Sequence, residues 1–219
     1  GMTDKPSLWE SSGRNLIKNG LGAEKAGFFS NFSKVENGYG ELTLESMNTY
    51  IAVNLSKGYV LGAREYEVGE NVTMSFDIMY TVWDIPEGAS LNEFWIGQRY
   101  LKPIWTRVTQ FDLPRVGEDG IEVNKWIHVE KTKTIPERPD EGISEEAYIR
   151  FYNRNKDVKA TITLRIKNVK LNYGDKATPW TPAPEDYSES YTQPCIGFAT
   201  TSSTVAPTDP SEYTWSRYL

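Results

Sequence analysis

The strongest constraint on the fold is the alternation of apolar and polar residues between Glu70 and Trp83. Successive side chains of a β-strand point to opposite faces, so a period of two predicts a long strand with one face in the core. The other face is semi-polar, which indicates that it is not fully buried. The predicted core face consists of Val72, Met74, Phe76, Ile78, Tyr80 and Val82, and the opposite face of Thr73, Ser75, Asp77, Met79, Thr81 and Trp83.

Shorter segments with similar patterns occur along the rest of the chain. Turn signals separate them, among them Pro86-Glu87-Gly88 and Gly117-Glu118-Asp119-Gly120. Many short strands with regular turns predict an all-β fold, a jelly-roll β-sandwich. The additional strands are expected at Glu41–Ser46, Thr49–Leu55, Glu93–Gly97, Ile104–Leu113, Lys125–Ile135, Glu146–Asn153 and Thr161–Asn172.

The sequence divides into four expected parts. Residues 1–13 form a lead-in, residues 14–175 the sandwich, residues 176–190 a Pro-rich linker packed on it, and residues 191–219 a short β appendage. Each proline fixes φ and removes a backbone donor, so the linker should be extended, with Trp180 as an apolar anchor. An appendage of two short strands has little core of its own and needs another surface to pack on.

Composition excludes several classes of partner. A net charge of −6 and a pI of about 5.0 argue against nucleic acid, because phosphate binding needs a basic patch. No apolar run approaches the roughly 20 residues that cross a bilayer, so we expect no membrane insertion. The single cysteine, Cys195, cannot form an intramolecular disulfide. Gly1-Met2 and the polar residues after it do not read as a signal peptide, so we expect no ordinary secretion.

Five segments together carry a family resemblance: GRNLIKNG at 13–20, NVTMSFDIMY at 71–80, KWIHVEKTKTI at 125–135, TLRIKNVKLNYGDKATPWTPAPED at 163–186, and VAPTDPSEYTWSRYL at 205–219. They resemble the carbohydrate-binding-module-like jelly-roll domains of tail-associated structural proteins from phages and prophages of Gram-positive hosts. Residues 89–120 fit this pattern least, and could carry the specificity of this chain.

The resemblance implies a non-enzymatic structural or adhesion protein of a phage or prophage tail, with weak binding to host-surface glycan. It implies a location in the virion tail, or in the host cytoplasm before assembly, with other tail proteins as partners and a homo-oligomer through the C-terminal segment. Two alternatives stay open from the sequence: a carbohydrate-binding module of a secreted polysaccharide-degrading enzyme, and a free-standing glycosidase or lyase. No cofactor is expected, although modules of this kind often carry a structural calcium ion.

Aromatic residues are the best candidates for a glycan site. The chain contains 7 Trp and 13 Tyr, and sugars stack their apolar faces on such rings while polar groups bind the hydroxyls. Tyr148, Arg150 and Tyr152 alternate along one predicted strand and so share a face. Ordinary strand packing is the competing interpretation for any single aromatic residue. The predicted glycan-binding residues are Trp95, Arg99, Tyr100, Trp105, Tyr148 and Arg150.

No catalytic motif accompanies the acidic residues. His128 is the only histidine, which excludes a two-histidine metal site, and no Gly-x-Ser-x-Gly motif is present. Asp77 and Glu130 are expected on the same semi-polar sheet face and could in principle form a hydrolytic pair. His128 is expected on the face of its strand that carries Glu130, either as a structural residue or as part of a binding face.

Overall fold

A computed structural model describes residues 13–22, 24–100, 106–138, 142 and 144–186, and the strand backbones of 195–198 and 214–217. The chain forms two compact units, Gly1–Ala183 and Pro184–Leu219. The second contains an antiparallel strand pair, β10 (Cys195–Phe198) and β11 (Thr214–Arg217). Within the described ranges the chain has no α-helix. It has three short 3-10 turns, Gly27–Phe29, Ser56–Gly58 and Pro184–Asp186.

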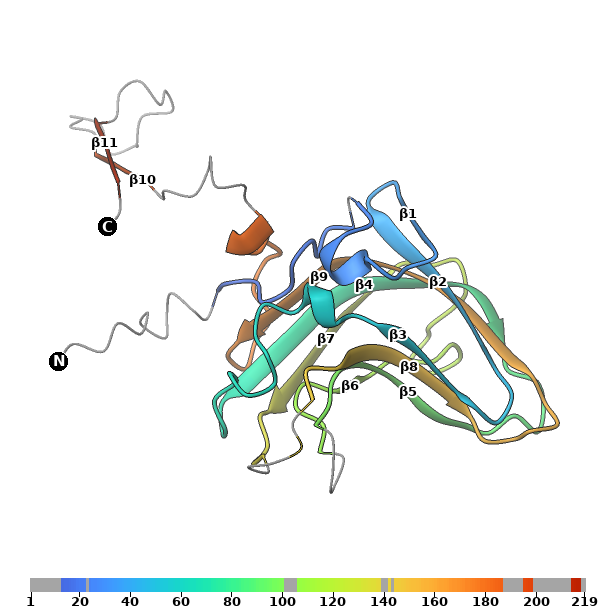
Figure 1. The fold of residues 1–219 in the computed structure, drawn as a ribbon. Helices are drawn as coiled ribbons and strands as arrows, with labels where there is room; N and C mark the ends of the chain where they lie inside the picture. The colour runs from blue at the N-terminus through green and yellow to red at the C-terminus, as the bar shows by residue number, and fades with distance from the viewer. Residues whose placement is uncertain are drawn as a thin grey trace. The chain divides into compact units, whose positions relative to one another are not determined.

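Two antiparallel sheets form the layers of the first unit (Figure 1). The five-stranded sheet has the order β1-β2-β9-β4-β7 and the four-stranded sheet the order β3-β8-β5-β6. This confirms the predicted jelly-roll β-sandwich. The strands are β1 (Lys34–Glu36), β2 (Tyr39–Ser46), β3 (Tyr50–Asn54), β4 (Asn71–Asp84), β5 (Leu91–Gln98), β6 (Phe111–Asp112), β7 (Ile127–Thr134), β8 (Ala147–Asn153) and β9 (Ala160–Tyr173).

The hydrophobic core lies between the sheets and follows the alternation of the long strands. In β4, the five residues from Val72 to Tyr80 that were assigned to the core are buried. In β9, Leu164 and Ile166 are buried whereas Arg165 and Lys167 point outward, as their spacing predicts. The inward faces of β8 and β5 complete the core with Ile149, Phe151, Phe94 and Ile96.

The predicted register of β4 is wrong beyond Tyr80. The pairing with β9 shifts between Tyr80 and Val82, so that one extra residue of β4 is accommodated there. Because a one-residue shift exchanges the two faces of a strand, Val82 points outward and is 41% exposed. Trp83 instead packs against the core, with its ring 5.0 Å from that of Tyr80.

The predicted strand at 104–113 is also wrong over most of its length. Only Phe111–Asp112 form a strand, and residues 106–110 are a loop held against the end of β5. Gly97 makes this close approach possible: its φ is +138°, and a Cβ there would lie 2.0 Å from the Thr109 carbonyl oxygen. The Thr109 side chain is buried in this contact and accepts a hydrogen bond from the Gln98 amide.

The segment before Ala183 is bound to β9 by several side chains. The Lys170 ammonium donates to the Pro179 carbonyl (2.8 Å) and the Thr181 hydroxyl (3.0 Å). Asn15 donates to the carbonyls of Val169 and Thr181, and the Trp180 indole donates to Val169. Residues 177–183 have no helical or strand assignment, and their proline-rich sequence accounts for it.

Phe76 tests the assignment of the core. Its side chain is fully buried in β4, so Phe76→Ala should lower the free energy of unfolding by about 3–5 kcal/mol through lost burial and the cavity left behind. The measurement is urea denaturation. Val82→Ala on the same strand is the control, and it should change stability by less than about 1 kcal/mol because Val82 is largely exposed. A loss below 1 kcal/mol for Phe76→Ala would contradict the packing.

Candidate ligand-binding face

The outer face of the four-stranded sheet carries a row of aromatic and charged side chains. Strand pairing aligns them in cross-strand rows: Tyr50 opposite Tyr152, with Glu93 beyond it, and Ala52 opposite Arg150, with Trp95 beyond it. Tyr148 forms the next row with Gly97. Since these residues alternate with the core residues of the same strands, they face away from the interior. Arg150 therefore occupies the middle of the face.

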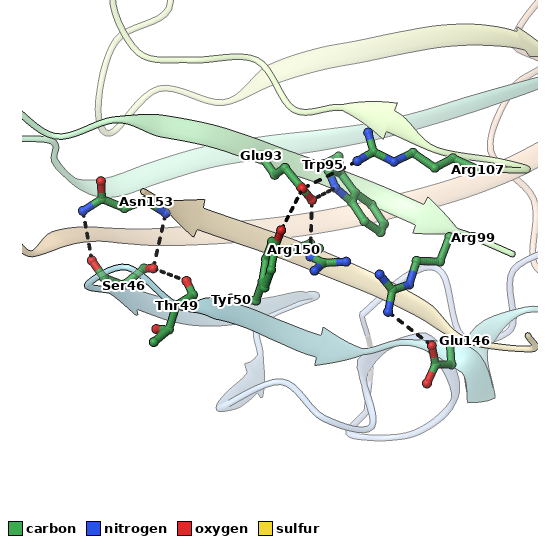
Figure 2. A network of polar contacts seen from close by, with 10 residues as sticks. All are labelled: Ser46, Thr49, Tyr50, Glu93, Trp95, Arg99, Arg107, Glu146, Arg150 and Asn153. Carbon is green, nitrogen blue, oxygen red and sulfur yellow. Dashed lines mark hydrogen bonds and ion pairs between the residues drawn. The ribbon is translucent and has the colours of Figure 1, made fainter. Parts of the chain in front are cut away.

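Glu93 connects most of these side chains (Figure 2). Its carboxylate accepts hydrogen bonds from the Trp95 indole nitrogen (3.0 Å) and the Tyr50 hydroxyl (3.4 Å). It also forms ion pairs with Arg150 (3.3 Å) and Arg107 (3.6 Å). One partly buried carboxylate thus contacts four neighbouring side chains and restrains them, which contributes to the preorganisation of a binding face.

Arg150 lies between aromatic rings. Its guanidinium carbon is 3.7 Å from the centroid of the Tyr50 ring and 5.8 Å from that of Trp95, within the range of cation–π attraction. The side chain is only 11% exposed, and this burial lowers the pKa of the guanidinium, with Glu93 opposing the effect. The centroids of the Tyr50 and Tyr152 rings are 4.1 Å apart and the rings are inclined by 30°, so they form a tilted pair in close contact at the surface.

A second, smaller cluster continues the face. Arg99 pairs with Glu146 at 3.5 Å, and its guanidinium lies 5.6 Å from the centre of the Tyr148 ring. Partial burial raises the pKa of the Tyr148 hydroxyl, and a hydrogen bond with Glu146 adds to the effect. The hydroxyl therefore stays protonated at neutral pH and remains a hydrogen-bond donor.

The structure brings Trp95, Arg99, Tyr148 and Arg150 to one face but corrects the expected role of two residues. Trp95 is 1% exposed and lies beneath Arg107 and Arg150, so its ring cannot stack on a sugar. Tyr100 is fully buried in the hydrophobic core. Apolar packing explains both, because a large ring gains most by leaving water. Trp105 lies outside the described residues.

Sequence reasoning missed Tyr50 and Glu93. Glu93 precedes Trp95 by two residues within one strand. Because side chains two residues apart point to the same face of a strand, the sequence could have predicted that Glu93 and Trp95 share a face. Tyr50 becomes part of the face only because β3 pairs with β8, and that pairing joins segments about one hundred residues apart. No pattern in the sequence around Tyr50 predicts this pairing.

Asp77, His128 and Glu130 lie together on the other sheet, as their expected positions in the strands imply. Asp77 is paired with His128 across β4 and β7, and Ser75 with Glu130. The His128 Nδ1 atom is 2.8 Å from Asp77, its Nε2 atom is 3.4 Å from Glu130, and Asn168 donates to the second Asp77 oxygen at 2.7 Å. The hydrogen bond with Asp77 raises the pKa of His128 above its ordinary value of 6.5. Burial is the next largest effect on this pKa and acts in the opposite direction, but it does not cancel the rise.

No metal site accompanies these groups. Within the described part of the chain, no set of three or more His, Cys, Asp or Glu side chains has an arrangement that could hold a metal ion. The described residues likewise include no helix long and apolar enough to span a membrane.

Comparisons with known proteins bear on this fold. The chain matches a chain from the structure of the tripod (BppUct-A-L) of the bacteriophage Tuc2009 baseplate, with 32% sequence identity and a TM-score of 0.75, over 94% of this chain and 71% of that one. A solved family 4 carbohydrate-binding module aligns with a TM-score of 0.36 at 13% identity, over 64% of this chain and 86% of that one. A xylan-binding domain of Paenibacillus barcinonensis aligns with a TM-score of 0.26 at 9% identity, over 62% and 87%. No family model and no curated protein sequence matches.

The class of protein follows from the fold together with the baseplate match. The chain is a carbohydrate-binding-module-like jelly-roll protein of a phage tail, which confirms the resemblance seen in the sequence. More particularly, it belongs to the family of phage baseplate tripod proteins.

The His128 cluster predicts a pH-dependent contribution to stability. A histidine whose pKa is raised in the folded state stabilises the protein below its unfolded pKa, and this contribution disappears as pH rises through the folded value. His128→Gln should therefore lower the free energy of unfolding at about pH 5 but not at about pH 8. Because the side chain is 56% exposed, we expect a difference below about 1 kcal/mol. Denaturation curves at both pH values test this, and an equal loss at both would contradict it.

Proposed function

We propose that this chain is a non-catalytic structural and adhesion component of a phage or prophage tail baseplate, and that it binds a host-surface glycan through the outer face of its four-stranded sheet. The single observation that carries the glycan proposal is the paired rings of Tyr50 and Tyr152 beside Arg150 and Glu93. Such a face offers a stacking plane together with charged hydrogen-bonding groups for sugar hydroxyls.

The proposed stacking surface is formed by tyrosines. Tyr50 is 50% exposed, and Tyr148 and Tyr152 are half-buried, whereas Trp95 supports the face from below. The proposed hydrogen-bond donors are Arg150, in the middle of β8, and Arg99, directly after β5. An open face of this kind favours weak binding, in the micromolar to millimolar range, because little of the ligand is desolvated. Several copies in one assembly would raise the overall affinity by avidity.

Membership of a baseplate family supports a place among other tail proteins. The tripod is the assembly named for the similar Tuc2009 chain, and we propose that this chain likewise assembles with tail proteins and with copies of itself through its C-terminal unit. The small β10–β11 pair favours this, since an isolated two-stranded sheet is marginal in water and gains from a partner surface. The same membership favours a tail protein over a module of a secreted enzyme.

Cell binding tests the proposed face. Tyr50→Ala combined with Tyr152→Ala should reduce binding to whole host cells about tenfold or more, because both stacking rings are lost. The melting temperature should fall little, as both side chains are partly exposed. The matched control is Trp126→Ala, which removes a 38% exposed ring from outside this sheet and should leave binding intact. Unchanged binding by the double variant would place the glycan site elsewhere.

Absence of turnover is a separate expectation. Incubation with polysaccharides and host cell-wall fractions should release no reducing ends, because no hydrolytic motif accompanies the acidic residues. The informative variants are Asp77→Asn and Glu130→Gln. Hydrolysis by the unmodified protein that either variant abolishes would establish an enzyme and overturn this part of the proposal.

A further inference from the structure

A hollow on the five-stranded sheet, away from the proposed glycan face, has the features of a second binding site. It measures about 400 Å³ and lies between the outer face of β4 and β7 and the returning segment 177–180. Its volume is within the range of small-molecule sites. The lining residues are Ser75, Asp77, His128, Glu130, Asn168, Ala177, Thr178, Pro179 and Trp180.

The aromatic wall of this hollow is held in place by the main domain. The Trp180 indole nitrogen donates to the Val169 carbonyl, so the ring cannot rotate freely. Lys170 anchors the same segment through the carbonyl of Pro179. A fixed ring beside carboxylates is an arrangement that attracts organic cations, through cation–π and ionic contacts together.

Ser75 contributes a hydroxyl to this site. The residue is 4% exposed and lines the hollow. A hydroxyl at such a position can accept a hydrogen bond from a ligand. Glu130 is the cross-strand partner of Ser75 on β7, and its exposed carboxylate lies on the same face of the sheet. Among the described residues, this carboxylate forms no ion pair with a lysine or arginine.

His128 adds a third acceptor when it is neutral. With Nδ1–H donating to Asp77, the neutral ring turns the Nε2 lone pair toward Glu130, so that two acceptors face each other at 3.4 Å. This contact is favourable only if a proton or another donor lies between them. Two lysines of β9 share this face. The Lys167 ammonium lies over the Trp126 ring, 4.4 Å from the centroid, and the Lys170 ammonium is directed to the Pro179 carbonyl and the Thr181 hydroxyl. The segment 177–180 contributes no titratable side chain.

We infer that this hollow binds a small organic ammonium ion, such as a sugar that carries a protonated primary amine. An ammonium group has three N–H donors, and Ser75, Glu130 and the Nε2 atom of His128 supply three acceptors in one hollow. Asp77, already oriented by Asn168 and His128, adds a second negative charge. Trp180 covers the ligand from the side of the returning segment. The site uses none of the residues of the proposed glycan face, so either proposal can fail without the other.

This assignment makes the ligand compete with a proton. The ammonium takes the place of the proton on Nε2, so binding should strengthen as the pH rises through the pKa of His128. The ligand should in turn lower that pKa. A neutral sugar of the same shape carries no positive charge and should produce neither effect.

The single histidine provides a direct readout. We would follow the Cε1–H resonance of His128 by NMR in the full chain while adding 6-amino-6-deoxyglucose, with glucose as the matched neutral probe, at about pH 5.5 and pH 8. The amine should shift the resonance at pH 8, bind more weakly at pH 5.5, and lower the titration midpoint of His128. Glucose should do none of these. Equal effects of the two sugars, or no effect of the amine, would overturn the inference.

Substitutions locate the site. Glu130→Gln should weaken binding of the amine about two- to fivefold, the range of an exposed ion pair, and Trp180→Leu should weaken it further. The matched control is Glu45→Gln, which removes an equally exposed carboxylate from the same sheet, where it pairs with Lys159, and should change nothing. Binding that is insensitive to Glu130→Gln would also overturn the assignment.

Discussion

The pairing of the two longest strands, β4 and β9, is the constraint on which the rest of this structure depends. Each has 14 residues, and together they form the middle of the five-stranded sheet. Their register shifts twice, and each shift exchanges the two faces of one strand beyond that point. The shift after Tyr80 turns Trp83 toward the core. The shift after Ser75 gives β9 an extra residue at Asn168, whose φ is +52°, and brings the Asn168 side-chain amide to Asp77. Core packing and the polar outer face are thus set by one strand pair.

Both outer faces place buried or half-buried charge next to aromatic rings, with different results. On the four-stranded sheet Glu93 accepts hydrogen bonds from Trp95 and Tyr50 and pairs with Arg150, which is held against the Tyr50 ring. On the five-stranded sheet the Ser75 hydroxyl lines the hollow, and Glu130 faces the His128 Nε2 atom, which is a donor only when the ring is protonated. The first face therefore holds its charged groups in contact with one another, whereas the second places acceptors around a hollow.

The segment before Ala183 connects β9 with the hollow on the five-stranded sheet. Lys170 and Asn15 hold its carbonyls, and Trp180 both anchors it and borders the hollow. These contacts restrain the direction of the chain up to Ala183.

The sequence by itself determined most of the strands, the fold class and the family, because the alternation of side chains along a strand can be read from the sequence alone. It also placed Tyr148, Arg150 and Tyr152 on a shared face, and Asp77 with Glu130 on another. Tertiary structure alone decided which aromatic rings meet solvent. Trp95 and Tyr100 are buried because the loop at 106–110 and the core cover them, and Tyr50 enters the face through a pairing between distant strands. Register shifts at Val82 and Asn168 have the same origin, since they depend on the partner strand and not on the strand's own residues.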